Sequence, residues 1–408
     1  MDWIKKNIKN LNFQLIVAII LGLIVGLIFP AFSKAIMPLG TIFLNMLKMI
    51  MVPLVFISIL NGICRIRKGK IFEKNLIKIV LYFIITSVIA IILGIIIGCI
   101  FNIGKNIENS FLEAEITEEY KYSIVDNIVS WFPTNIFEAF KNADIPQILI
   151  ISLLVGFAIN KQGEKGKKIY NVIEYCYDII INIVNIIMKF APIGTFALIA
   201  NMVLTLNKSF IVTLALYIFA DIIGCSIIIF IEYSIMLKVI ANVSPKYFFE
   251  KVWKIIVVAV TTTSSVATLP ISLKCLKDDM KVEDEFASFA LSLGNAINKD
   301  GMAFPLGLIS IFAANLYGVP ITIGYILNVI FVSLLLSMST ASVKGAGIVI
   351  SSNMLQSLGF SLGLVPVLTT IWPVIDPGHT TANCIGDICC IKIVSERERN
   401  IVGESSKK

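Results

Sequence analysis

Apolar stretches long enough to cross a bilayer recur along the chain. About 20 consecutive apolar residues form a helix that crosses ~30 Å of hydrocarbon. Such stretches occupy about residues 12–30, 37–63, 75–101, 126–160, 170–204 and 208–240, the fourth with a break near Pro146. The first runs into Pro30 without a small-residue cleavage site, so it predicts a retained helix and not a signal peptide. The pattern predicts an all-α, polytopic membrane protein without a large soluble domain.

After Val243 the apolar segments become shorter and are interrupted by small polar residues. Residues 247–278 enclose the polar tip TTTSSVATLP and precede a helix expected at about 283–314. Residues 321–357 enclose the tip SMSTASVKGAG and precede a helix expected at about 359–393. Irregular backbone at membrane depth survives only when buried in protein or lining a wet cavity. The repeated design predicts the binding site of a transporter, and the alternative is a surface of small residues where helices pack.

Composition and charge support a membrane protein and predict which side of the membrane its loops and termini face. Of 408 residues 57% are hydrophobic and 15% charged, whereas a soluble domain has about 25% charged residues. Cytoplasmic loops collect Lys and Arg, and four basic clusters fall on one side of the expected spans: Lys5, Lys6 and Lys9; Arg65, Arg67, Lys68 and Lys70; Lys161, Lys165, Lys167 and Lys168; Lys407 and Lys408. Residues 108–119 are acidic and suit the outer face. We therefore expect a multi-pass protein of the inner or plasma membrane, surrounded by lipid, with both termini cytoplasmic.

Several functional classes fit the sequence poorly. The basic residues are dispersed among loops, which argues against a nucleic acid partner. Eight cysteines and one histidine show no paired metal-ligand spacing, so we expect neither a zinc site nor a disulfide framework. An enzyme needs a base beside its nucleophile, and a channel favours charged rings or filter loops. A transporter of a small organic solute remains, without catalytic residues or a cofactor.

The last expected helix carries a polar stripe. Asp376, Thr380, Asn383 and Asp387 are spaced by four, three and four residues, which places them on one helical face. An intramembrane carboxylate costs ~2.5–3.5 kcal/mol on insertion scales, so it normally faces a cavity and binds a cation. We predict that Asp376 binds a substrate ammonium and Asp387 an ion. The alternative is pairing with a fixed cation, for which Lys299 is the candidate.

The preceding helix should be unwound near Asp300. Asn298 and Asp300 are two residues apart, so a regular helix would point them to different sides. Gly301 tolerates the backbone angles of an unwound turn. Freed carbonyls with these two side chains offer the hard oxygen ligands that a small cation prefers. Thr86 and Ser87 add hydroxyls, which alternatively bond to carbonyls of their own helix.

Five motifs together carry a resemblance to a known family. These are FAPIGTFALIA at 190–200, TTTSSVATLP at 261–270, NKDGMAFP at 298–305, KGAG at 344–347 and DPGHTTANCIGD at 376–387. In this order, over nearly the whole chain, they resemble the dicarboxylate/amino acid:cation symporter family, which includes the glutamate transporters. The resemblance implies eight transmembrane helices, two re-entrant helical hairpins, inverted repeats and a homotrimer that works by an elevator movement.

The resemblance also implies a division of the chain and the roles of residues. Scaffold helices 1–2 would lie in residues 1–74 and helices 4–5 in 123–207. The transport domain would comprise helix 3 at 75–101 and residues 208–395, namely helix 6, hairpin 1, helix 7, hairpin 2 as the gate and helix 8, before a cytoplasmic tail at 396–408. Substrate would bind at Ser264, Ser265, Met302, Val343, Gly345, Gly347, Asp376, His379, Thr380 and Asn383. Co-transported Na⁺ or H⁺ would bind near Thr86, Ser87, Gly294, Asn298, Asp300, Ser337, Asn383 and Asp387, with Na⁺ at Asp300 and Asp387.

One departure from the family pattern concerns the substrate. His379 stands where members with acidic substrates carry Arg, and Met302 stands in place of Thr, so a bidentate guanidinium clamp is lost. This favours a neutral or small polar amino acid, with glutamate, aspartate or a C4-dicarboxylate as the alternative. The histidine would make transport pH-dependent, or it merely fills space beside a carbonyl.

A second departure concerns the coupling ion. Lys299 replaces the family's usual Met beside the predicted cation ligands, and Lys344 and Ala296 also depart from the pattern. A tethered ammonium at this position would stand in for a bound ion, which would reduce the cation stoichiometry or replace sodium coupling by proton coupling or exchange. The alternative is that Lys299 faces an aqueous path or pairs with Asp300 or Asp387.

Overall fold

The computed structural model describes residues 11–65, 73–105, 129, 131–202, 208–340 and 345–405, and these contain no strand. The prediction of an all-α protein is confirmed. The helices are α2 Leu11–Ile28, α3 Pro30–Arg65, α4 Glu73–Ile100, α6 Ile136–Lys141, α7 Ile145–Lys161, α8 Glu164–Met202, α9 Lys208–Ser226, η3 Ile227–Glu232, α10 Tyr233–Ala241, α11 Pro245–Thr262, α12 Ser265–Lys274, η4 Cys275–Asp279, α13 Asp284–Ile297, α14 Asp300–Tyr317, α15 Ile323–Met338, α16 Ala346–Ser357, η5 Leu362–Leu364 and α17 Val365–Ser405.

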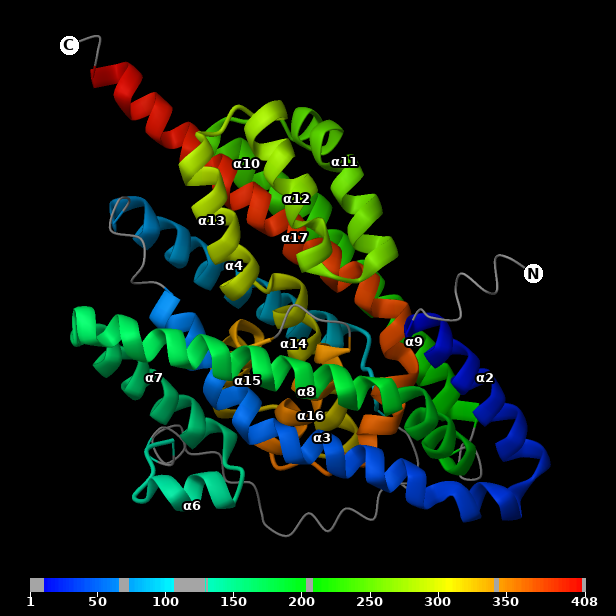
Figure 1. The fold of residues 1–408 in the computed structure, drawn as a ribbon. Helices are drawn as coiled ribbons and strands as arrows, with labels where there is room; N and C mark the ends of the chain where they lie inside the picture. Colours follow the sequence, from blue (N-terminus) through cyan, green and yellow to red (C-terminus); the bar gives the residue numbers. More distant parts are fainter. Residues whose placement is uncertain are drawn as a thin grey trace.

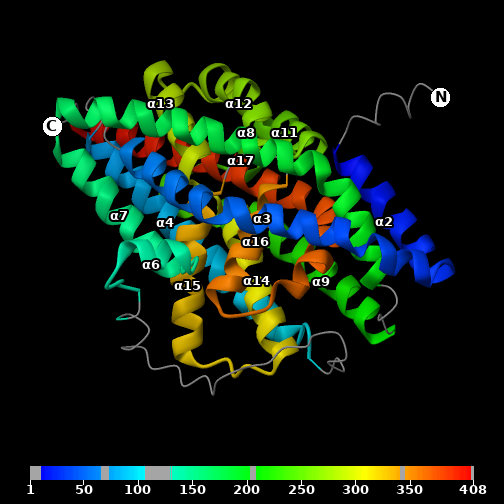
Figure 2. The ribbon, with the colours of Figure 1, turned by 60° about the horizontal axis from the view of Figure 1, so that its bottom comes forward.

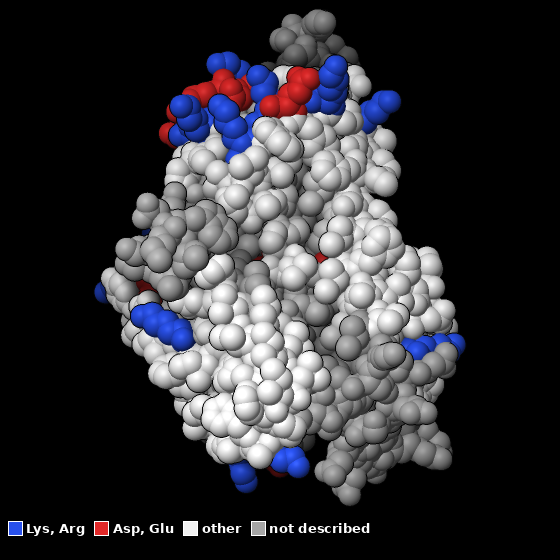
Figure 3. Space-filling view, turned by 90° about the vertical axis from the view of Figure 1, so that its right-hand side faces the viewer, with Lys and Arg blue, Asp and Glu red and all other residues white. Residues whose placement is uncertain are grey.

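Length and hydropathy of these helices fit a bilayer. Within the part of the chain that the structure describes, five segments are long and apolar enough to cross it: Pro30–Cys64, Ile77–Ile100, Glu164–Asn201, Val212–Ala241 and Asp284–Tyr317. Three shorter apolar helices accompany them. Charged side chains gather at one end of the molecule, near the end of α17, and few lie across the broad middle of the face in Figure 3. This distribution is that of a multi-pass membrane protein.

Prolines lie at two helix boundaries, of which the pattern predicts the break near Pro146 correctly and places the start of α3 too late. α3 begins at Pro30 and not near residue 37, because proline is well suited to the first turn of a helix, where its missing N–H costs nothing. Pro146 likewise lies in the first turn of α7, so the break in the fourth stretch precedes it. The stretch 208–240 contains an unexpected π-helical segment, η3, between α9 and α10. Such segments are often found near functional sites.

The helices form two groups that pack against each other. α2, α3, α7 and α8 make their main contacts among themselves, and Figures 1 and 2 both show α3 and α8 side by side. α4 and the helices from α9 to α17 form the second group, in which α17 contacts α9, α10, α11, α13 and α14. The second group therefore contains the two polar tips and the interruption between α13 and α14.

Each of the two expected polar tips is the turn between a pair of helices. α11 ends at Thr262, Thr263 adopts a left-handed conformation (φ 47°), and α12 starts directly after Ser264. α15 ends at Met338, and α16 starts after Gly345, which has φ 76°. Val343 and Lys344 lie outside the described residues. Neither tip is an uninterrupted helix in the parts that are described.

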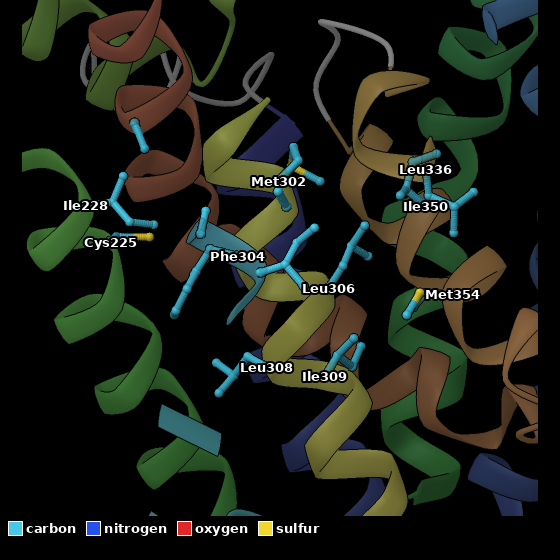
Figure 4. Close-up of a cluster of buried hydrophobic side chains, with 14 of the residues drawn as sticks. Cys225, Ile228, Met302, Phe304, Leu306, Leu308, Ile309, Leu336, Ile350 and Met354 are labelled. Carbon is cyan, nitrogen blue, oxygen red and sulfur yellow. The ribbon is translucent and has the colours of Figure 1, made fainter. Parts of the chain in front are cut away.

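α14 lies at the centre of the second group, and nearly all its residues are buried. Figure 4 shows Phe304 of α14 on the side of Cys225 and Ile228. On the face toward α4, a Cβ atom at Gly94 would overlap the Phe304 carbonyl oxygen, and one at Gly307 would overlap that of Ile91. The two helices thus approach backbone to backbone at a pair of glycines, a contact typical of helices packed in a membrane.

Candidate functional site

The site is built around the interruption between α13 and α14. α13 ends at Ile297, Asn298 is extended (φ −83°, ψ 114°), Lys299 lies outside helical geometry (φ −141°, ψ 49°), and α14 begins at Asp300. The predicted unwinding is therefore present. Gly301 is required because a Cβ there would overlap backbone atoms of His379 in α17. This close approach brings the interruption against the polar stripe of α17.

The Asp300 carboxylate accepts hydrogen bonds from three hydroxyl groups. Thr86 and Ser87 of α4 donate to its Oδ1 at 3.0 and 2.8 Å, as the grouping of these residues predicts. Tyr233, the first residue after the π-helical segment, donates to Oδ2 at 3.1 Å. All four side chains are at most 1% exposed. Hydrogen bonds to the charged form stabilise a buried carboxylate, and its oxygens are hard ligands for a small cation.

Asp387 lies on the other side of the interruption. Asn298 Nδ2 donates to its Oδ1 at 3.0 Å. A Cβ at Gly294 would lie 2.5 Å from the same oxygen, so glycine makes room for the carboxylate. Asn383 Oδ1 accepts from the Gly301 amide at 2.9 Å, which ties α17 to the first turn of α14. Gly294, Asn298, Asn383 and Asp387 thus lie together, as predicted.

A small cavity adjoins this region and gathers most of the residues expected to bind substrate. Its lining residues come from both helix–turn–helix units, the interruption and the stripe of α17: Thr263, Ser265, Lys299, Met302, Thr340, Ala346, Gly347, Asp376, Thr380 and Asn383. Asp376 is 8% exposed and Thr380 5%. The cavity is therefore lined by a carboxylate, the Lys299 side chain, hydroxyls and an amide, which suit a small polar molecule.

His379 does not line this cavity. Its Nε2 lies 3.0 and 2.9 Å from the two carboxylate oxygens of Asp221 in α9, and both side chains are essentially inaccessible. The Asp221 carboxylate holds the histidine outside the cavity. His379 is therefore not placed to donate a hydrogen bond to a substrate there. Cys225 lies one turn after Asp221 and contacts the same carboxylate at 3.8 Å. Their ligand atoms and that of His379 all lie within 4.8 Å, a grouping of metal-ligand types that the sequence spacing did not predict.

Three further residues of the predicted set have other local roles. Ser264 caps α12 by accepting from the Ala267 amide at 3.4 Å. Ser337 donates to the Leu334 carbonyl at 2.9 Å, within its own helix. Gly345 precedes α16 and faces Met188 of α8. None of these three lines the cavity, and Val343 lies outside the described residues.

Asp221 and Tyr233 were missed by the sequence analysis. Asp221 is a lone carboxylate within the apolar stretch 208–240, and an intramembrane carboxylate is by itself a functional signal. Tyr233 gave no such signal, because tyrosine is common in apolar helices and only the fold brings it to Asp300. Its hydroxyl also lies 3.0 Å from the Ala382 carbonyl, so it connects α10, α14 and α17.

Comparison with known proteins is consistent with this geometry. The chain is 28% identical over 403 positions to a C4-dicarboxylate transport protein of Bacillus subtilis, covering 96% of this chain and 94% of that protein. It is 30% identical over 361 positions to a C4-dicarboxylate transport protein of Pseudomonas savastanoi, covering 86% and 77%. It is 28% identical over 421 positions to a proton/sodium-glutamate symport protein of Geobacillus stearothermophilus, covering 98% and 97%. The model of the sodium:dicarboxylate symporter family matches residues 11–397, and the chain belongs to that family.

Proposed function

We propose that this protein carries an acidic amino acid, glutamate or aspartate, across the cell membrane together with Na⁺ or H⁺. Family membership makes the chain a cation-coupled transporter and not an enzyme. The observation that carries the substrate assignment is the cavity in which Asp376 lies with Thr380, Asn383 and the first turn of α16. An intramembrane carboxylate that faces a cavity is suited to bind a cationic group, and the ammonium of an amino acid is such a group.

The sequence favours a neutral amino acid because His379 stands where a guanidinium clamp for a second carboxylate is lost. Asp221 binds that histidine outside the cavity, so His379 serves neither class of substrate as a donor, and the choice between them falls to the relatives. The names of the relatives favour the alternative, an acidic amino acid or a dicarboxylate. The backbone amides near Ser265 and at the start of α16 would hold the α-carboxylate, since helix N-termini favour anions.

A C4-dicarboxylate is the second candidate, and the names of two relatives support it. A dicarboxylate has no ammonium, so Asp376 would repel it unless the carboxylate were protonated or bound a cation. The role of Asp376 therefore separates the two substrate classes.

For the transport cycle we propose the division that the family resemblance implies. Residues 1–74 and 123–207 would form a scaffold, and residues 75–101 and 208–395 a transport domain, which agrees with the two packing groups of helices. The units around Thr263 and Gly345 would be re-entrant hairpins, the second acting as the gate. Elevator movement would take place in a homotrimer with cytoplasmic termini.

Two positions suited to a positive charge complete the proposal, and the co-transported cation would use at least one of them. One is the Asp300 carboxylate with Thr86 and Ser87, and the other is the Asp387 carboxylate with Asn298 and Asn383. Each combines a carboxylate with neutral oxygen groups at the helix interruption, an arrangement that suits a small hard cation.

Uptake by proteoliposomes tests the substrate. Labelled glutamate, aspartate, succinate and alanine are compared under a sodium gradient, a proton gradient or neither, with the wild-type protein and the Asp376→Asn variant. We expect glutamate or aspartate to be accumulated, and Asp376→Asn to raise their KM by about 30-fold or more, since losing one member of a buried charge pair costs ~2–5 kcal/mol.

The exposed Asp278, changed to Asn, is the matched control and should leave KM unchanged. Succinate uptake that Asp376→Asn leaves intact, without glutamate uptake by the wild type, would assign the chain to the dicarboxylates. Accumulation of alanine alone would show that the acidic-substrate proposal is wrong.

A further inference from the structure

Lys299 is a buried cation at the centre of the helix interruption. Its side chain is 1% exposed, among the largest fully buried side chains that the structure describes. A charge taken out of water to this extent must be compensated by charged or strongly polar groups. What surrounds the Lys299 ammonium therefore determines what it does.

The first compensating group is the end of α13. Lys299 Nζ donates to the Asn295 carbonyl at 2.6 Å. Asn295 lies in the last turn of α13, whose terminal carbonyls lack helical partners and carry partial negative charge. A free cation at this position would be held by the same kind of oxygen atom.

The second compensating group is the Asp387 carboxylate, which lies against Asn298, the residue that precedes Lys299 in the chain. Asn298 binds the same carboxylate through Nδ2, and its own Oδ1 has no hydrogen-bond partner among the described residues. Lys299 thus shares the helix interruption with a carboxylate, a helix-end carbonyl and an amide oxygen. These are oxygen ligands of the type that bind Na⁺.

Asp300 is arranged differently, although it is only one residue away. Its carboxylate accepts from three neutral hydroxyls, those of Thr86, Ser87 and Tyr233. Hydroxyl groups reorient, so they can turn their oxygens toward an arriving ion. The two carboxylates are therefore not equivalent, because Asp387 has a cation built into the chain beside it and Asp300 has neutral partners.

We propose that the Lys299 ammonium permanently occupies the place of a co-transported cation beside Asp387, so that one mobile ion fewer accompanies each substrate molecule. The mobile cation binds at Asp300. This inference rests on the proposed symport for its consequence in transport, but the binding of ions by the empty protein tests it independently.

The experiment removes the tethered charge while keeping the length of the side chain. Lys299→Met is compared with wild type by thermal unfolding in detergent without substrate, over a series of NaCl concentrations with choline chloride at constant ionic strength. Ligand that binds only the native state raises its stability in proportion to the logarithm of ligand concentration above Kd. We expect Na⁺ to raise the Tm of Lys299→Met more steeply than that of wild type.

In proteoliposomes the same variant should show a sodium Hill coefficient higher by about one, because an additional ion now binds cooperatively with substrate. Lys299→Arg keeps the charge and should retain the wild-type response. Lys392→Met is the matched control, since Lys392 is also buried in this group of helices but contacts Glu396 and the Met280 carbonyl.

Several outcomes would overturn the inference. Equal sodium dependence of Tm for wild type and Lys299→Met shows that Lys299 does not occupy an ion's place, as does an equal gain for Lys392→Met. If Lys299→Met does not fold, Lys299→Met with Asp387→Asn removes both charges, and this double variant must regain the fold without gaining a sodium response. Failure of all uptake with an intact sodium effect on Tm would contradict the proposed function alone.

Discussion

The buried pair of Asp221 and His379 leads to a quantitative prediction for Asp221→Ala. The substitution removes both contacts of Nε2, at 2.9 and 3.0 Å, and His379 Nδ1 already has no hydrogen-bond partner among the described residues. The side chains are 1% and 0% exposed, so water does not replace the lost partner. Losing the partner of a buried hydrogen bond to a charged group costs ~1.5–3 kcal/mol. We expect the free energy of unfolding to fall by about that amount.

Asp221→Asn is the matched variant, because it keeps the volume and one acceptor oxygen. Its expected loss is ~1–2 kcal/mol, the cost of a weakened hydrogen bond. Unfolding by SDS titration in mixed micelles measures both variants. A double-mutant cycle with His379→Ala should give a coupling of about 1–3 kcal/mol. An Asp221→Ala loss below ~1 kcal/mol that adds to the His379→Ala loss would refute the pairing.

The pairing of Asp221 with His379 also predicts that a substitution of the histidine leaves the substrate KM nearly unchanged. Because His379 does not line the cavity, His379→Gln should alter the substrate KM less than about threefold, which corresponds to ~0.6 kcal/mol. Its effect should appear as lower thermal stability. A large rise in KM with unchanged stability would place His379 at the substrate, contrary to its position beside Asp221.

Two further substitutions test the helix interruption. Tyr233→Phe removes a donor 3.1 Å from Asp300, so it should lower stability by ~1.5–3 kcal/mol and weaken the sodium dependence of uptake. Unchanged sodium dependence would exclude Tyr233 from the cation position. Gly301→Ala places a methyl group on the backbone of His379 and strains the bond from the Gly301 amide to Asn383. It should lower the unfolding free energy by ~1–3 kcal/mol and reduce uptake, whereas Gly62→Ala, whose Cβ would make only an ordinary contact of 3.7 Å with Ile297, should leave uptake unchanged.

Local patterns in the sequence were sufficient for the helices and for the interruption. Hydropathy located the spans, and the spacing of Asn298 and Asp300 followed by Gly301 predicted the unwound turn. Both signals depend on residues close together in the sequence, because the local geometry of the chain determines whether they form a helix or an unwound turn. Helix starts were less accurate for α3, which begins at Pro30, whereas hydropathy places its start near residue 37. The break expected near Pro146 is present, because α7 starts at Ile145.

Contacts between helices that are far apart in the sequence could not be predicted from such local patterns. The partner of His379 lies 158 residues earlier, and nothing in the spacing of α17 indicates that α9 packs beside it. Tyr233 reaches Asp300 only after a π-helical segment has shifted the register of the preceding helix. The direction in which a side chain points depends on which helices adjoin, and the resemblance to a family placed His379 at the substrate without that information.

The glycine crossing of α4 and α14 has a mechanical consequence. Gly94 and Gly307 let the two backbones touch, so neither helix can slide along the other without carbonyl groups colliding. We therefore expect Thr86 and Ser87 to move together with Asp300 when the helices shift. An ion bound among them, as proposed, would then leave without these two helices parting, and the cavity lined by Thr263 and by Lys299 and Met302, which flank Asp300 in the chain, is the route that the structure offers.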